Sequence, residues 1–143
     1  MLLIKEIKKK DSDLCFDLDS NTISLWSKKQ WDNEFKKKGI KVFGLLLSDL
    51  VIGICVVQVV IDEAQINYFA IKKSFQRQGY GSALMKYLLR ECEKFKIKKL
   101  LLEVSQSNLV AEKFYSQFDF FTVGIRKKYY RDGCSAFLKE KKL

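Results

Sequence analysis

The chain has 143 residues, of which 48% are apolar, and its 27 Lys and Arg against 17 Asp and Glu give a formal net charge of +10. This length and composition predict a single globular domain over residues 1–143 that is large enough to bury a core. The longest apolar run is broken by Ser48 and Asp49 and is too short to span a bilayer, and the N-terminus lacks a secretory leader pattern, so we expect a cytoplasmic protein without a membrane partner.

Composition also limits the chemistry of a catalytic site. The chain has no His, so a general base has to be a carboxylate, a Tyr, a Cys or a water molecule. The four Cys are far apart and form no Cys-x-x-Cys pair, which predicts free thiols rather than disulfides or a metal site. The Lys pairs are scattered and mostly lack neighbouring aromatic residues. This favours a solvated basic surface over a dedicated nucleic-acid site, while attraction to an RNA-rich partner stays open.

Apolar patterning in chain order predicts an α/β (α+β) protein. Runs of apolar and β-branched residues predict strands at residues 3–8, 41–47, 50–61, 63–71, 99–104, 118–126 and 135–141. Capping residues and helical spacing predict helices at residues 11–18, 27–39, 82–96 and 108–117. Ser48-Asp49 and Arg131-Asp132-Gly133 supply turns between consecutive strands. The strand at 99–104 follows a strand–helix unit, so it should run parallel to residues 66–71 through a right-handed crossover.

The sequence from Ile66 to Ser82 predicts a strand, a glycine-containing loop and the start of a helix. Gly79 and Gly81 leave backbone N–H groups uncovered at the helix start, and the helix dipole adds positive potential there. The loop is therefore a candidate pyrophosphate site. A P-loop needs Lys followed by Ser or Thr after its second Gly, and a dinucleotide loop needs a third Gly where this chain has Leu84. An ordinary glycine turn before a helix remains the alternative.

The spacing Gln76-x-x-Gly79-x-Gly81 resembles the acetyl-CoA loop of the GNAT acetyltransferase superfamily. Other segments are similar to that superfamily, and to its bacterial members that acetylate the N-terminal alanine of a small-subunit ribosomal protein, at residues 26–27, 58–64, 102–108, 113–115, 118–120 and 129–130. The resemblance spans residues 3–140 and implies a mixed, mostly antiparallel sheet of about seven strands with a central parallel pair and helices on both faces. The chain departs from the family pattern at Asp119 (usually Gly), Leu25 (usually Pro) and Lys72-Lys73 (usually Asp-Pro).

The resemblance implies acetyl-CoA as cosubstrate, with no metal. The central strand would splay from its parallel neighbour and offer backbone groups to the pantetheine amides, and one of its N–H groups could stabilise the oxyanion. The loop N–H groups would hold the pyrophosphate. Asn108 could bind the pantetheine arm as well as cap a helix. The implied cofactor-binding residues are Phe69, Ala70, Ile71, Gln76, Arg77, Gln78, Gly79, Tyr80, Gly81, Ser82 and Asn108.

Two residues are candidates for proton transfer. Glu103 is out of pattern near the end of an apolar strand, and the resemblance makes it the general base that takes the amine proton through a water molecule. The alternative is a rim carboxylate paired with a nearby Lys. Tyr115, rotated about 100° from Phe114 on its helix, would give a proton to the leaving thiolate, and the alternative is a half-buried core aromatic. Tyr129 and Tyr130 would flank the acceptor groove or simply pack together.

The predicted activity is acetyl transfer from acetyl-CoA to an amine by direct attack in a ternary complex, most specifically to the N-terminal alanine of a ribosomal protein. An α-amino group, with a pKa of about 8, is neutral far more often at pH 7 than a Lys side chain with a pKa of about 10.4, so an N-terminus suits a modest base. Two alternatives stay open: an enzyme of the same superfamily for a small-molecule amine, and a non-catalytic basic module that binds ribosomes or RNA on the same fold.

Overall fold

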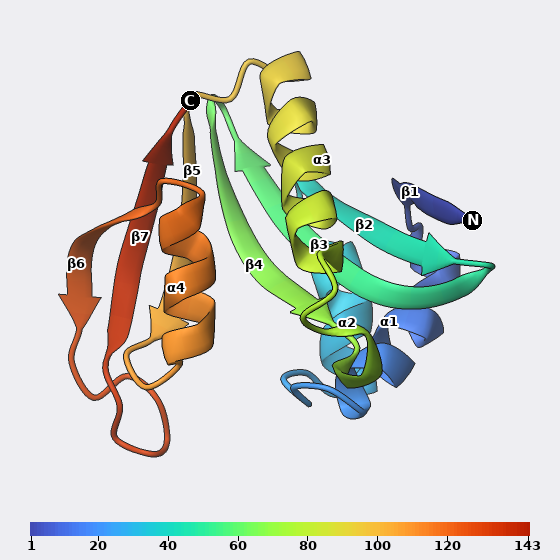
Figure 1. The fold of residues 1–143 in the computed structure, drawn as a ribbon, viewed down its shortest axis with the longest axis horizontal. Helices are drawn as coiled ribbons and strands as arrows, with labels where there is room; N and C mark the ends of the chain where they lie inside the picture. Colours follow the sequence, from blue (N-terminus) through green and yellow to red (C-terminus); the bar gives the residue numbers. More distant parts are fainter.

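The strands form one seven-stranded sheet in the order β1-β2-β3-β4-β5-β7-β6 (Figure 1). The structure, a computed structural model, describes residues 1–143. All neighbouring strands are antiparallel except β4 and β5, which are parallel. The predicted mixed sheet with a central parallel pair is therefore confirmed. Its strands are β1 (Leu2–Glu6), β2 (Ile40–Leu47), β3 (Leu50–Val60), β4 (Glu63–Ile71), β5 (Lys99–Ser105), β6 (Phe121–Arg126) and β7 (Ala136–Lys142).

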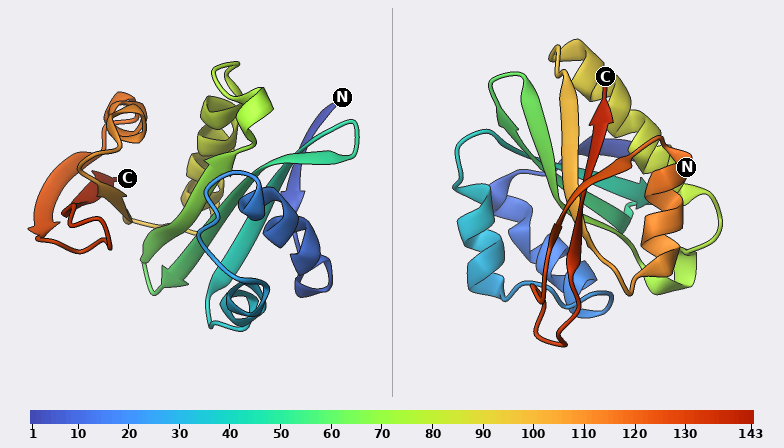
Figure 2. Two further views of the ribbon diagram at one scale, coloured as in Figure 1. Left: turned by 90° about the horizontal axis from the view of Figure 1, so that it is seen from below. Right: turned by 90° about the vertical axis from the view of Figure 1, so that its left-hand side faces the viewer.

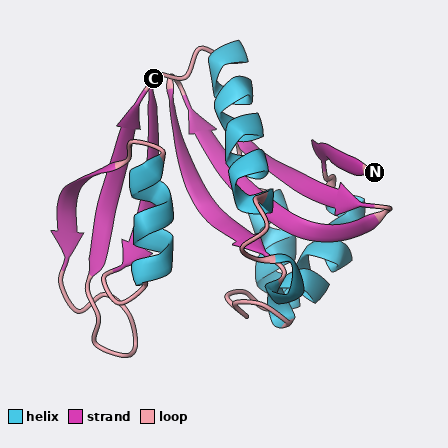
Figure 3. Ribbon diagram, viewed as in Figure 1, coloured by secondary structure: helices cyan, strands magenta, loops and turns pink.

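Helices cover both faces of the sheet, as predicted. Figures 2 and 3 show α1 and α2 on one face and α3 and α4 on the other. None of the helices combines the length and the apolar content that a membrane crossing requires. The helices are α1 (Ser12–Ser20), α2 (Lys28–Phe35), α3 (Tyr80–Lys94) and α4 (Leu109–Gln117), and short 3-10 turns lie at Lys9–Asp11 and Lys73–Phe75.

Each face of the sheet has its own apolar core. The larger core packs α3 and α4 on the sheet and includes Leu84, Leu88 and Tyr115. The smaller core packs α1 and α2 on the other face and includes Cys15 and Trp31. β3 contributes to both cores because its central residues are buried on both sides, as its almost wholly apolar sequence predicts.

β4 and β5 pair over only part of their length. Their register runs from Glu63 opposite Lys99 to Ile66 opposite Leu102. Beyond these pairs the two strands separate toward the end of the sheet where both finish (Figure 1). The expected splaying of the central strand from its parallel neighbour is thus present.

A β-bulge at Asn67 accompanies this separation. Ile66 pairs with Val57 and Tyr68 pairs with Val56, so Asn67 is an extra residue in β4. One extra residue reverses which side chains face each side of a strand. Ile66 accordingly packs in the α3–α4 core and Tyr68 in the α1–α2 core, while Phe69 points back to α4.

The predicted helix starts are partly right. Ser27 and Gln30 form a reciprocal capping box at α2, and Asn108 Oδ1 accepts a hydrogen bond from the Ala111 N–H at 3.1 Å. Asp11 precedes α1 but makes no capping bond with its side chain, since the chain enters α1 through a 3-10 turn. α3 begins at Tyr80, earlier than predicted, because Gly79 in a left-handed conformation (φ +86°) is its N-cap.

The predicted start of the strand at residue 118 is wrong. The chain leaves α4 through Asp119, whose φ is +63°, and β6 begins only at Phe121. Asp tolerates the left-handed region better than most residues. It can therefore occupy the position at which the family pattern has Gly.

Gly39 should be intolerant of any side chain. Its φ is +80°, and a Cβ there would lie 2.2 Å from the Val59 carbonyl oxygen. Gly133 is a matched control, because its φ is +84° and a Cβ would meet nothing within 4 Å. Gly133→Ala should lower the free energy of unfolding by about 1 kcal/mol through backbone strain alone, and Gly39→Ala by roughly 2 kcal/mol more. Urea denaturation measures both, and equal losses would contradict the clash.

Candidate active site

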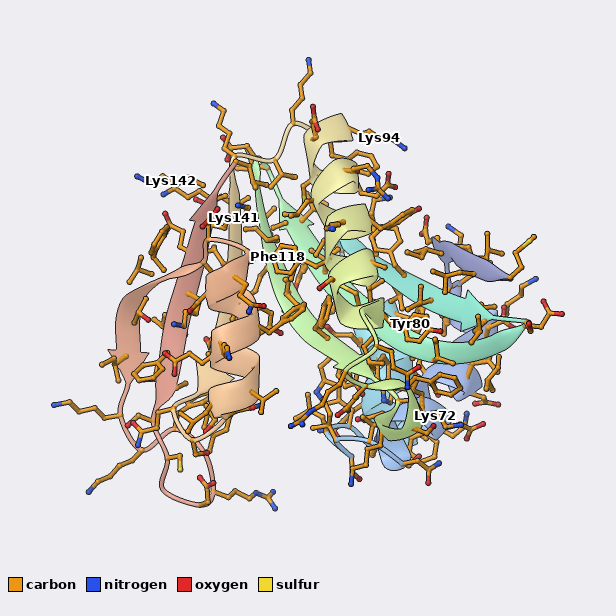
Figure 4. The ribbon with its side chains drawn as sticks, in the orientation of Figure 1. Lys72, Tyr80, Lys94, Phe118, Lys141 and Lys142 are labelled. Carbon is orange, nitrogen blue, oxygen red and sulfur yellow. The ribbon has the colours of Figure 1, made fainter.

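The loop between β4 and α3 presents a series of free backbone donors. The backbone N–H groups of residues 77–82 donate to no acceptor within the protein, and Figure 4 shows Tyr80 at the first turn of α3. The loop and the corner before it carry no acidic residue, and their cations are Lys72, Lys73 and Arg77. Free N–H groups at a helix N-terminus, together with this positive charge, suit a phosphate ligand.

Two glutamines of the predicted site hold the loop in place. Gln76 Nε2 donates to the Ile71 carbonyl at 2.8 Å, and Gln78 Nε2 donates to the Ser74 carbonyl at 3.2 Å. Their side-chain amides therefore stabilise the conformation of the loop. The helix start packs closely on α4, because a Cβ at Gly81 would lie 3.4 Å from the ring of Phe114.

The end of β4 is open on the side where β5 has separated. On the side of β4 that faces β5, no strand pairs with residues 69–71. Part of their backbone hydrogen-bonding capacity is therefore left for a ligand. The Phe69 ring centroid lies 5.6 Å from that of Phe114 and 6.3 Å from that of Tyr115. The structure therefore brings the open strand, the glycine loop and α4, which Asn108 caps, to the same end of the sheet (Figure 1).

Tyr115 is a core residue, with 8% of its surface exposed. Its ring packs edge-on against Phe114 and Phe120. Burial, and after it the nearby Cys55 thiol, raises the pKa of the Tyr115 phenol. The phenol is therefore protonated at neutral pH, so it can donate a hydrogen bond or a proton but cannot act as a base.

Glu103 leaves β5 on the face opposite Tyr115. Its neighbours Leu102 and Val104 are buried in the α3–α4 core, so the alternation of a strand sends Glu103 to the other face. The Glu103 side chain is 21% exposed, and its Oε1 lies 3.2 Å from Nε of Arg126. The alternative interpretation of Glu103 was a rim carboxylate paired with a nearby Lys; the structure does pair it with a cation, but that cation is Arg126 from β6.

The separated ends of β4 and β5 lie between these two residues. Glu103 is the first residue of β5 beyond its last pair with β4. Phe69, beside Tyr115, stands on the separated part of β4.

Lys139 is a supporting residue that sequence reasoning missed. Although it is a lysine, it is buried, and its Nζ donates to Glu112 Oε1 at 3.1 Å and to Thr122 Oγ1 at 2.8 Å. Glu112 lies about one helical turn before Tyr115, so Lys139 anchors the helix that carries the phenol. A lysine in the middle of a predicted strand is ordinarily assigned to the solvent face, so the apolar pattern of the sequence did not indicate that Lys139 is buried.

The structure offers no side-chain cluster for a metal ion. No group of three His, Cys, Asp or Glu residues comes together with suitable geometry. Cys15, Cys55 and Cys92 are buried as single thiols.

Comparison with known proteins identifies relatives of this chain. The profile of the Acetyltransferase (GNAT) family matches residues 9–120. A ribosomal protein bS18-alanine N-acetyltransferase of Haemophilus ducreyi is 32% identical over 131 residues, which cover 90% of this chain and 88% of that protein. The crystal structure of the ribosomal-protein-S18-alanine N-acetyltransferase from Escherichia coli matches with a TM-score of 0.93 at 29% identity, covering 99% of this chain and 94% of that one. A GNAT family acetyltransferase from Elizabethkingia anophelis with acetyl-CoA bound shares the fold, with a TM-score of 0.82 at 20% identity, covering 99% of this chain and 98% of that one.

The native protein should expose one reactive thiol. Burial raises the pKa of Cys92 to about 11 and that of Cys15 to about 12, and it also raises the pKa of Cys55. These groups stay as unreactive thiols at pH 8, whereas Cys134 is only half-buried. Titration with DTNB at pH 8 should find one thiol in the native chain and all four after unfolding.

Cys134→Ser is the control for this titration, because it should abolish the native reaction. Fast native labelling of a second thiol would contradict the burial argument.

Proposed function

The chain belongs to the acetyltransferase (GNAT) family, and on that premise we propose that it transfers an acetyl group from acetyl-CoA to the N-terminal alanine of ribosomal protein bS18. This acceptor is the one that the names of the Haemophilus ducreyi and Escherichia coli relatives give. The observation that carries the proposal is the separation of β4 from β5 beyond Ile66 and Leu102, with free backbone donors on one face of the sheet and the Glu103 carboxylate on the other. The two proposed partners, acetyl-CoA and bS18, are both cytoplasmic.

The α3–α4 face suits the cosubstrate. Acetyl-CoA supplies the thioester and carries a pyrophosphate, which the free N–H groups of residues 77–82 and the Arg77 side chain would bind. The open edge of residues 69–71 would bind the pantetheine amides as a sheet edge binds an added strand, and Asn108 would add a side-chain contact. One backbone N–H of this edge would stabilise negative charge on the thioester oxygen in the transition state.

The opposite face suits the amine. Glu103 would take the amine proton through a water molecule, and the amine would attack the thioester carbonyl. The Glu103–Arg126 pair is partly exposed, and such a pair contributes at most about 1 kcal/mol, so the ammonium group of the acceptor can displace Arg126. As the new C–N bond forms and the C–S bond breaks, the Tyr115 hydroxyl would donate a hydrogen bond to the leaving sulfur. Because the pKa of Tyr115 is raised, full proton transfer would follow only as the thiolate charge develops.

Turnover should depend on both groups. Glu103→Gln and Tyr115→Phe should each lower kcat by about tenfold or more, in an assay that follows CoA release with an alanine-initiated peptide. Acetyl-CoA binding should survive in both variants, and a thermal-shift assay at about 100 times the Kd should report stabilisation of about 2.7 kcal/mol.

Matched control variants separate a specific loss of catalysis from a general effect of the substitution on the fold. Glu140→Gln changes a carboxylate of β7 that pairs with Lys99, and Tyr87→Phe changes a half-buried phenol that packs on Phe43. Both controls should keep wild-type turnover. Wild-type turnover in both site variants would remove the assigned roles, and no stabilisation by acetyl-CoA in the wild type would remove the cosubstrate.

The acceptor should be an α-amino group rather than a Lys side chain. At pH 7 to 8 far more of an α-amine is neutral, so a bS18 N-terminal peptide should be acetylated at its first residue, with a rate that rises with pH up to about 8. Mass spectrometry locates the acetyl group. The same peptide with a blocked N-terminus and an internal Lys is the control, and it should stay unmodified.

Two results would redirect the assignment. Faster acetylation of small free amines than of the peptide would indicate an enzyme for a small molecule. Unmodified bS18 should also accumulate in a strain that lacks the gene, and fully acetylated bS18 in that strain would rule out the proposed acceptor.

A further inference from the structure

Lys139 in β7 is the one Lys or Arg side chain of the chain that is buried. Its Nζ donates hydrogen bonds to Glu112 Oε1 in α4 at 3.1 Å and to Thr122 Oγ1 in β6 at 2.8 Å, and it lies 5.5 Å from the centroid of the Phe137 ring. A buried cation is tolerated only when it is paired and hydrogen-bonded. Lys139 and Glu112 therefore form an ion pair between the sheet and the helix, the β7–α4 pair.

The β7–α4 pair acts on the part of α4 that carries the phenol. Glu112 lies three residues before Tyr115, which places the two side chains about 60° apart around the helix axis and about 4.5 Å apart along it. A contact that holds Glu112 in one direction therefore also sets the direction of Tyr115.

The other side-chain contacts between α4 and the sheet are apolar. The Phe114 ring centroid lies 5.6 Å from that of Phe69, and the Tyr115 ring centroid lies 5.7 Å from that of Phe120. Aromatic pairs are favourable over a range of centroid distances, about 4.5–7 Å, so they hold α4 against the sheet without fixing its rotation. The β7–α4 pair is the one hydrogen bond or ion pair that joins a side chain of α4 to a strand.

Stability alone does not account for a charge at this position. Lys139 and Phe137 share the α4 face of β7, and Phe137 packs on the α3–α4 core. The Lys139 side chain is 4% exposed and that of Glu112 is 29% exposed. Replacing such a buried pair with apolar residues of similar volume often leaves stability equal or higher. What an apolar contact lacks is the fixed length and angle of a hydrogen bond.

We propose that Lys139 and Glu112 are positioning residues for Tyr115. Their bond fixes the rotation of α4 about its axis, so that the Tyr115 hydroxyl points to the leaving sulfur of acetyl-CoA. The pair acts through the phenol, and its contribution is direction rather than stability. This inference rests on the proposed role of Tyr115 in acetyl transfer and adds two residues to that site.

Two variants separate direction from stability. The apolar pair, Lys139→Met with Glu112→Leu, keeps the volume and removes the directed bond. Its urea midpoint should stay equal or rise, while kcat for CoA release with a bS18 N-terminal peptide should fall by roughly fivefold. Glu112→Gln keeps an oxygen acceptor but loses the charge that strengthens the bond. Its urea midpoint should fall, while kcat should stay within about twofold of the wild type.

A double-mutant comparison shows whether the loss of kcat passes through the phenol. In a Tyr115→Phe background the apolar pair should lower kcat by less than about twofold further, because the hydroxyl that it misplaces is already absent. Thr122→Val is the matched control, since it removes the other hydrogen bond of Lys139 without touching α4, and it should leave kcat unchanged. Wild-type kcat in the apolar pair, or a loss that adds fully to that of Tyr115→Phe, would overturn the inference.

Lys139→Met alone gives the same readouts if the apolar pair does not fold. Its Glu112 carboxylate is already partly exposed, at 29%, so it can turn to water when the ammonium group is gone.

A spectroscopic measurement does not need activity. The chain has six Tyr, and 3-fluorotyrosine gives each of them a fluorine resonance, of which Tyr115 is identified by its loss in Tyr115→Phe. This resonance should shift in the apolar pair while the others stay in place, and it should stay in Glu112→Gln, which changes the charge but keeps the bond. An unmoved resonance in the apolar pair would also overturn the inference. If the wild type releases no CoA, the proposed function fails, whereas the resonance still decides whether the pair positions Tyr115.

Discussion

The early end of the β4–β5 pairing is the constraint on which the rest of the site depends. Parallel strands bury their backbone groups against each other, and here that pairing stops at Ile66 and Leu102. The bulge at Asn67 then reverses the alternation of β4, so Tyr68 and Phe69 are anchored in different cores. Beyond this point both strands still pack on the α3–α4 core, β4 through Ile71 and β5 through Val104.

The charges follow the same division into two faces. The glycine loop on the α3–α4 side has cations and free N–H groups and no acid, which suits an anionic cosubstrate. The carboxylates Glu103 and Asp19 lie on the other face, in different roles. Glu103 shares a partly exposed pair that costs little to break. Asp19 is buried with four donors, so losing it would leave several polar groups unpaired in the core.

Local signals predicted most of the fold because they act within a few residues. The capping box at Ser27, the cap at Asn108 and the left-handed turn residues Ser48 and Asp49 all lie where the sequence placed them. The predicted start of β6 was wrong, because the left-handed turn at Asp119 interrupts the extended chain before Phe121. The partners of Glu103 and Lys139 were missed for another reason: sheet pairing brings them from distant parts of the chain.

The sequence by itself determined the order of strands and helices, the parallel central pair and the position of the glycine-containing loop between β4 and α3. These features follow from apolar periodicity, capping residues and glycine placement, which are properties of neighbouring residues. Only the tertiary structure decided that Glu103 and Tyr115 lie on opposite faces of the sheet near the end of the β4–β5 pairing, and that Asp19 is buried with four hydrogen-bond donors. The face of the sheet on which a strand residue lies depends on every β-bulge before that residue. A buried carboxylate is identified only by the hydrogen-bond donors that surround it in the folded chain.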